Sequence, residues 1–143
     1  MPTAVPLNYL AVFVAAASSM VLGFLWYGPV FGKPWMALMG FTKESMDAAK
    51  AKGMAKSYAI MAIGSIFMSF VLAHAFVFAS TYMQVTGVSA GLQTGFWNWL
   101  GFIAPVVVGD QLWGGKSWKL FPITAGYYLV SLCMMGVILA VWM

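Results

Sequence analysis

Few polar side chains interrupt the apolar stretches of this sequence, and two pairs of them could form hydrogen bonds in an apolar environment. Thr94 and Asn98 are four residues apart, so they share one face of a helix. Tyr128 and Ser131 are three residues apart and share a face in the same way. Uncharged hydroxyl and carboxamide groups can bind a polar solute or join neighbouring helices. The pattern therefore predicts either a polar pathway or an interhelical contact.

The sequence offers few ligands for a metal ion or a cofactor. It contains one histidine, His74, and one cysteine, Cys133. A metal site needs several nitrogen, sulfur or carboxylate ligands that converge, so we predict no metal site within one chain. His74 is a weak candidate ligand for a haem or another pigment, but Phe70, one turn earlier, leaves little room for a macrocycle. We predict no cofactor.

The residues needed for catalysis are also missing from the pattern. No serine or cysteine has a histidine base nearby in sequence, and no glycine-rich phosphate loop is present. A proton-coupled exporter would be expected to carry an acid deep in an apolar stretch. The acids are Glu44 and Asp47, in a charged segment, and Asp110, at the end of an apolar stretch. We therefore predict neither an enzyme nor such an exporter.

The composition predicts that these residues lie in membrane-spanning helices. Of 143 residues, 63% are hydrophobic and 7% are charged, and the mean hydropathy is +0.90, whereas soluble domains carry roughly a quarter charged residues. A span needs about 20 apolar residues. We predict one domain, 1–143, an all-α bundle of four transmembrane helices at 7–27, 57–80, 88–109 and 120–142. The first span is longer than the apolar core of a signal peptide, and Gly28-Pro29 is expected to end it.

Small residues recur at helical spacing and predict where these helices pack closely. They form packing seams in the first and third spans, at Ala11, Ala15, Ser19, Gly23, Gly91 and Gly95. In the third span, Asn98, Gly101 and Pro105 continue the stripe of Gly91, and Pro105 is expected to kink the helix near Gly101. Several small-residue faces exceed what one protomer needs. We therefore expect a homo-oligomer or a place among other membrane subunits.

Lysine marks one side of the membrane. All the lysines lie in the two loops 28–56 and 110–119: Lys33, Lys43, Lys50, Lys52, Lys56, Lys116 and Lys119. The positive-inside rule places both loops in the cytoplasm and both termini outside, as in a bacterial inner membrane. Binding of these lysines to anionic lipid headgroups of the bilayer explains the net charge of +4. A nucleic-acid partner is not needed.

The first loop contains its own helix signals. Thr42 can cap the free amides of a helix, and Gly53 suits the position past its C-terminus. Glu44 lies in the first turn, and Lys50 and Lys52 lie in the last, so the charges complement the helix dipole. We predict a short amphipathic helix here.

Two segments resemble a known family. The segments WYGPVFGKPWM and GKSWKLFPITAGYYLVSLCMMGVILAVW resemble the small membrane proteins of the domain-of-unknown-function family 1761. The shared motifs are Phe31-Gly32-Lys33 with Trp35, and the run from Ala125 to Ser131. The resemblance runs nearly end to end, implies a four-span architecture and carries no activity, since the family is uncharacterised.

Two functions are therefore open. The leading hypothesis is a structural or accessory membrane subunit that acts through helix packing. The alternative is an oligomeric channel or carrier for a small neutral or weakly polar solute, which would use Thr94, Asn98, Tyr128 and Ser131.

Overall fold

The structure, a computed structural model, describes residues 4–143, in which helices are joined by short loops and turns and no strand is present. The helical fold class is thereby confirmed. The elements, with η for π-helical turns, are α1 (Tyr9–Leu25), η1 (Trp26–Val30), α2 (Gly32–Met39), α3 (Lys43–Lys52), α4 (Ala55–Met83), α5 (Gly87–Asn98), η2 (Trp99–Ile103), α6 (Ala104–Gly114) and α7 (Leu120–Trp142).

Among residues 4–143, three helices are long and apolar enough to cross a membrane: Tyr9–Val30, Ala55–Met83 and Leu120–Trp142. At 1.5 Å per residue the shortest is about 33 Å long, against a hydrocarbon thickness of about 30 Å. The predicted third span is instead built from α5, η2 and α6 in direct succession. Pro105 has no amide for the carbonyl of Gly101, and the π-helical turn lies at that point.

The expectation that Gly28-Pro29 ends the first helix is wrong. The backbone widens into the π-helical turn η1, which contains Pro29, and the helix continues to Val30. The amide of Phe31 donates to the carbonyl of Trp26 at 2.8 Å, a bond across five residues that closes the wider turn.

The two loop helices have clear start and stop signals. α3 confirms the predicted helix: the amide of Ser45 donates to Thr42 Oγ1 at 3.0 Å, and Gly53 follows with a φ of 86°. The helix α2 was not predicted from the sequence. Pro34 lies in its first turn, where a missing amide costs little, and Gly40 ends the helix with a φ of 73°.

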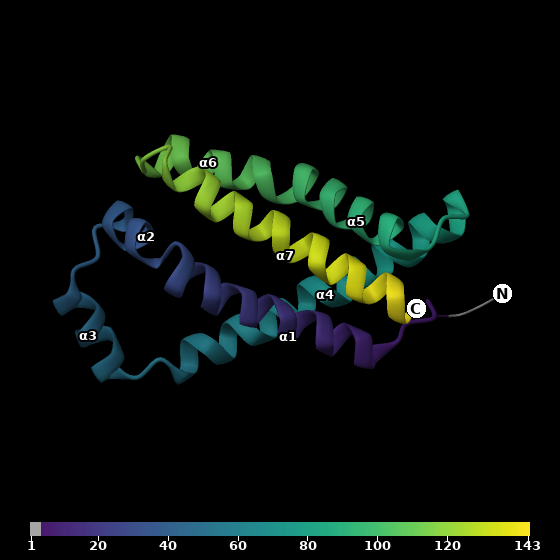
Figure 1. Ribbon diagram of the computed structural model, residues 1–143, viewed down its shortest axis with the longest axis horizontal. Helices are drawn as coiled ribbons and strands as arrows, with labels where there is room; N and C mark the ends of the chain where they lie inside the picture. The colour runs from purple at the N-terminus through teal and green to yellow at the C-terminus, as the bar shows by residue number, and fades with distance from the viewer. Residues whose placement is uncertain (1–3) are drawn as a thin grey trace.

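The helix α7 is at the centre of the bundle. It packs against α5, α1, α4 and α6, and α1 also packs against α4. Figure 1 shows α7 between α1 and the α5–α6 rod, with α2 and α3 at one end and the C-terminus at the other. The main core cluster joins α1, α4 and α7 and includes Val12, Leu72, Met135 and Leu139.

The small residues of the predicted seams lie at helix contacts. Ala11, Ala15 and Ser19 are buried, and Gly23 lies against the ring of Tyr127. Gly91 and Gly95 contact the backbone of α7 directly. The stripe predicted through Gly101 and Pro105 is not continuous, because the π-helical turn η2 rotates the helix and leaves both residues exposed.

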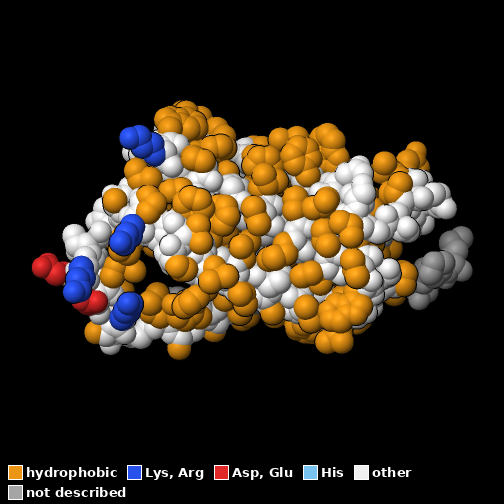
Figure 2. All heavy atoms as spheres, in the orientation of Figure 1, with side chains coloured by type: hydrophobic (Ala, Val, Ile, Leu, Met, Phe, Trp, Pro, Cys, Tyr) orange, Lys and Arg blue, Asp and Glu red, His pale blue; other side chains and the backbone are white. Residues whose placement is uncertain are grey.

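The charged side chains gather at one end of the molecule. All the lysines named above are exposed, and Figure 2 shows lysine and acidic side chains at the end where α2 and α3 lie. The body visible beside them is covered mainly by hydrophobic side chains.

Candidate functional site

The four candidate polar residues separate into two groups. Thr94 and Asn98 lie together on α5 and line a cleft that faces α4, whereas Tyr128 and Ser131 of α7 lie outside it. Thr94 is buried and donates its hydroxyl to the carbonyl of Ala90 at 2.9 Å. Ser131 is buried and Tyr128 is half-buried.

The cleft between α4 and α5 has a polar part, here called the polar cleft. It has a volume of about 140 Å³, room for about four or five water molecules. Its polar side chains come from the end of α4 and from α5: Ser80, Gln93, Thr94, Trp97 and Asn98. Small and apolar residues, such as Ala75 and Ala79, form the rest of the wall.

A second cavity, here called the apolar groove, continues from Asn98 towards the cytoplasmic ends predicted for these helices. Its volume is about 440 Å³. Its lining is apolar apart from Asn98 and comes from α4, η2 and α7: Phe67, Met68, Val71, Leu72, Phe102, Ile103 and Leu132. Asn98 lines both cavities, so its side chain lies between them.

The opening between α4 and α5 follows from how each helix is held. Gly95 lies against the backbone of α7, where a Cβ would come 2.5 Å from the carbonyl oxygen of Leu132. The buried hydroxyl of Ser69 joins α4 to α1 instead, through a 2.8 Å hydrogen bond to the carbonyl of Val12. Because α5 is bound to α7 and α4 to α1, the space between α4 and α5 is left partly open.

The π-helical turn η2, which follows Asn98 in the sequence, is held in place by a tryptophan. Trp99 begins the π-helical turn η2 and donates its indole N–H to the carbonyl of Ala125 at 2.8 Å. Trp26 begins η1 and donates in the same way to the carbonyl of Ile123, two residues earlier on α7, at 2.9 Å. Both π-helical turns are therefore attached to α7 by an indole.

Asn98 has hydrogen-bonding capacity that its own helix does not use. Its Nδ2 donates to the carbonyl of Thr94 at 2.8 Å. A carboxamide has two N–H donors and one oxygen acceptor, and within residues 4–143 no other hydrogen bond to this side chain forms. The charged residue types Lys, Asp and Glu are missing from the lining of both cavities, as is His. The site can therefore offer uncharged donors and acceptors to a neutral polar group.

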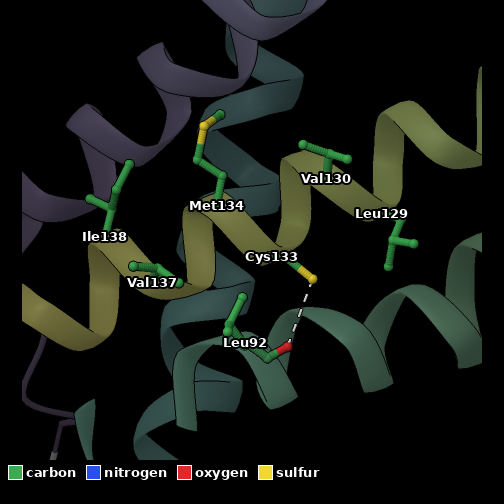
Figure 3. A pocket seen from close by; sticks show the side chains of 7 residues that line it. All are labelled: Leu92, Leu129, Val130, Cys133, Met134, Val137 and Ile138. Atoms are coloured by element: carbon green, nitrogen blue, oxygen red, sulfur yellow. Dashed lines mark hydrogen bonds between the residues drawn. The ribbon is translucent and has the colours of Figure 1, made fainter. Parts of the chain in front are cut away.

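The other candidate ligands lie elsewhere. The His74 ring packs between Phe70 and Phe78, and its Nδ1 lies 2.9 Å from the carbonyl oxygen of Phe70. Cys133 faces α5 on another side of α7, with its Sγ 3.8 Å from the carbonyl oxygen of Leu92 (Figure 3). In the part of the chain that the structure describes, no three His, Cys, Asp or Glu side chains form a group that could hold a metal ion.

Two buried polar residues, Tyr127 and Gln111, were not predicted from the sequence. Tyr127, the neighbour of the predicted Tyr128, donates its hydroxyl to the carbonyl of Ser19 at 3.0 Å. Gln111 of α6 is only 4% exposed, and its Oε1 has no hydrogen-bond partner among the described residues. The spacing of Gln111 four residues after Val107, which is also buried, could have indicated an inward-facing position.

Comparison with known families gives one match. The model of the family described as "Protein of unknown function (DUF1761)" matches residues 10–140. The chain belongs to this family. The DUF1761 match includes α5, η2 and both cavities, so the site lies within the shared domain. No curated protein and no solved structure matches the chain.

Proposed function

We propose that this DUF1761 protein crosses the membrane four times and binds or carries small neutral or weakly polar molecules. The single observation that carries the binding function is the position of Asn98. Asn98 lines both the polar cleft and the apolar groove, and its Oδ1 and one N–H are unused. A polar group in hydrocarbon without a partner costs several kcal/mol, so a polar ligand would stabilise it.

The fourth span in this proposal is the rod formed by α5, η2 and α6. Its three segments follow one another without a break and pack along α7. The lysine-rich ends of the helices then lie on the cytoplasmic side of a bacterial inner membrane, and both termini lie on the outer side. The test is labelling of single cysteines in intact spheroplasts, in a Cys133→Ala background. Lys50→Cys should resist a membrane-impermeant maleimide and Gln84→Cys should react, and the opposite pattern would refute this orientation.

Flux through proteoliposomes tests the binding function. Stopped-flow light scattering would follow the entry of glycerol and urea with the unaltered chain and with Asn98→Leu. The loss of one hydrogen bond of about 0.5–1.5 kcal/mol should slow the protein-dependent flux by about 2- to 12-fold. Cys133→Ala, which changes a residue outside the cleft, is the control. Flux that is equal in all three proteins, or equal to that of empty liposomes, would contradict the carrier function.

A structural or accessory subunit is the second candidate. It is favoured by a further apolar groove of about 440 Å³ on the outer side of α5 and α7, lined by residues such as Leu92, Val130 and Met134 (Figure 3). Another helix could pack there. Native mass spectrometry of the gently extracted protein would show a defined homo-oligomer or a bound membrane subunit if this role is correct. A bare monomer would argue against it.

The lysine-rich end is proposed to anchor the protein to anionic lipids. α3 carries exposed Lys43, Lys50 and Lys52 beside the membrane-length helix α4. Each lysine near an anionic leaflet contributes about 1 kcal/mol.

A further inference from the structure

We propose that the molecule bound at Asn98, beside the polar cleft and the apolar groove, is a neutral amphiphile dissolved in the membrane: one uncharged hydroxyl or carbonyl group on a single hydrocarbon chain. The polar group would lie at Asn98 in the polar cleft, and the chain would lie in the apolar groove. This inference rests on the proposed binding function and names its ligand class.

The apolar groove opens sideways, towards the lipid. Three of its lining side chains are among the most exposed large hydrophobic residues: Phe67 is 66% exposed, Val71 62% and Phe102 73%. Phe67 and Val71 lie in the middle of α4, and Phe102 lies in η2, between α5 and α6. At that depth a bilayer provides hydrocarbon and no water. A chain that enters the groove therefore comes from the bilayer.

The hydrogen-bonding groups at Asn98 select a neutral polar group. Asn98 offers an acceptor, its Oδ1, and a donor, its second N–H. A hydroxyl group can use both, and a carbonyl group can accept from the N–H. Trp97, which is 62% exposed and lines the polar cleft, adds an indole nitrogen that donates no hydrogen bond to the described residues.

The same surroundings disfavour a charged group. A carboxylate or phosphate is usually held by arginine or lysine, and neither lines these cavities. A cationic head would need a carboxylate, which is equally missing from the lining. The lysines lie at the end of the molecule near α2 and α3 (Figure 2). An unpaired charge at mid-membrane depth is costly, so anionic lipid headgroups do not fit this site.

The volumes of the two cavities agree with a ligand that has a small polar head group and a larger hydrocarbon chain. The polar cleft, at about 140 Å³, accepts only a small head group. The apolar groove is about three times larger, at 440 Å³, which falls in the range of about 300–1,000 Å³ for small-molecule sites.

Photolabelling in liposomes of uncharged lipid tests this inference. The probe is hexadecanol that carries a diazirine on its chain, and mass spectrometry locates the labelled peptides. We expect labelling on α4 and η2 that excess hexadecanol suppresses and that hexadecane and hexadecyltrimethylammonium do not. Equal suppression of the labelling by all three competitors would overturn the proposal that the ligand is a neutral amphiphile. Val71→Trp, which fills the apolar groove, should reduce labelling by about tenfold, equivalent to about 1.4 kcal/mol.

The matched control is Val130→Trp, which fills the similar groove on the outer side of α5 and α7. It should leave the labelling of α4 and η2 unchanged, and the thermal unfolding midpoints of both variants verify that they fold. Labelling that is unaffected by Val71→Trp, or spread evenly over both grooves, would overturn the inference. Asn98-dependent glycerol flux would then still support the binding function. Specific labelling without flux would support the inference and exclude transport of small solutes.

Discussion

Gly91 of α5 and Gly136 of α7 lie so close together that a Cβ on either residue would overlap the carbonyl oxygen of the other. Such contacts between helix backbones allow Cα–H···O interactions and dense packing, which drive helix association in lipid. This pair holds α5 close to α7.

The first prediction concerns this glycine pair. Gly91→Ala should destabilise the protein by about 1–3 kcal/mol or more, because the added methyl group forces two backbones apart. The free energy of unfolding in mixed detergent micelles measures the effect. Gly64→Ala is the control: Gly64 lies within α4, and no atom is near its hypothetical Cβ. That variant should be neutral or about 0.5–1 kcal/mol more stable. Equal effects at both positions would show that the contact between α5 and α7 is not tight.

The second prediction concerns the indole of Trp99. Trp99→Phe removes the hydrogen bond to the carbonyl of Ala125 but keeps an aromatic ring. The protein should lose about 0.5–1.5 kcal/mol of stability, at the lower end if the average of about 0.6 kcal/mol within membranes holds. Trp113→Phe changes a side chain that is 91% exposed and should have little effect. If the two variants melt at the same temperature, the indole does not hold η2.

The third prediction concerns the contact between α1 and α7 at Gly23 and Tyr127. A Cβ on Gly23 would lie 3.1 Å from the hydroxyl oxygen of Tyr127, which donates to the carbonyl of Ser19. Gly23→Ala and Tyr127→Phe should each destabilise the protein. The double variant should lose about 0.5–1 kcal/mol less than the two effects combined, because removing the hydroxyl relieves the crowding. Strictly additive losses in the double-mutant cycle would mean that these residues do not touch.

The apolar content and the capping residues were sufficient to predict much of the fold. Three of the predicted spans correspond to continuous helices, and Thr42 and Gly53 correctly bounded the loop helix α3. These features depend on local chemistry, that is on hydropathy, side-chain caps and glycine conformation. Pro105 predicted a disruption of the helix near Gly101, where η2 lies, but the π-helical form of the two turns was not predicted, since a wider turn also depends on what lies beside it. For η2 that neighbour is α7, which accepts the indole of Trp99.

The site was only half predictable for a related reason. Helical spacing correctly placed Thr94 and Asn98 on one helix, but no local signal says which helix they face. Tyr127 and Tyr128 are adjacent, and helical geometry turns them about 100° apart. Packing against α1 alone decides that Tyr127 is the buried one. The cleft lies beside the contact between Gly91 and Gly136, which brings α5 close to α7, whereas α5 and α4 touch through Ala90 and Phe76.

The most direct test of the central claim is a spectrum of the Asn98 carboxamide itself. Asn8 and Asn98 are the asparagines of the sequence, and Asn8, at the start of α1, donates to the carbonyl of Trp142 and lines neither cavity. Solid-state NMR of protein with carbon-13 asparagine in bilayers would resolve both side-chain carbonyls. Adding hexadecanol should shift the Asn98 signal and leave the Asn8 signal in place, whereas hexadecane should shift neither. An Asn98 signal that does not respond to saturating hexadecanol would contradict the account.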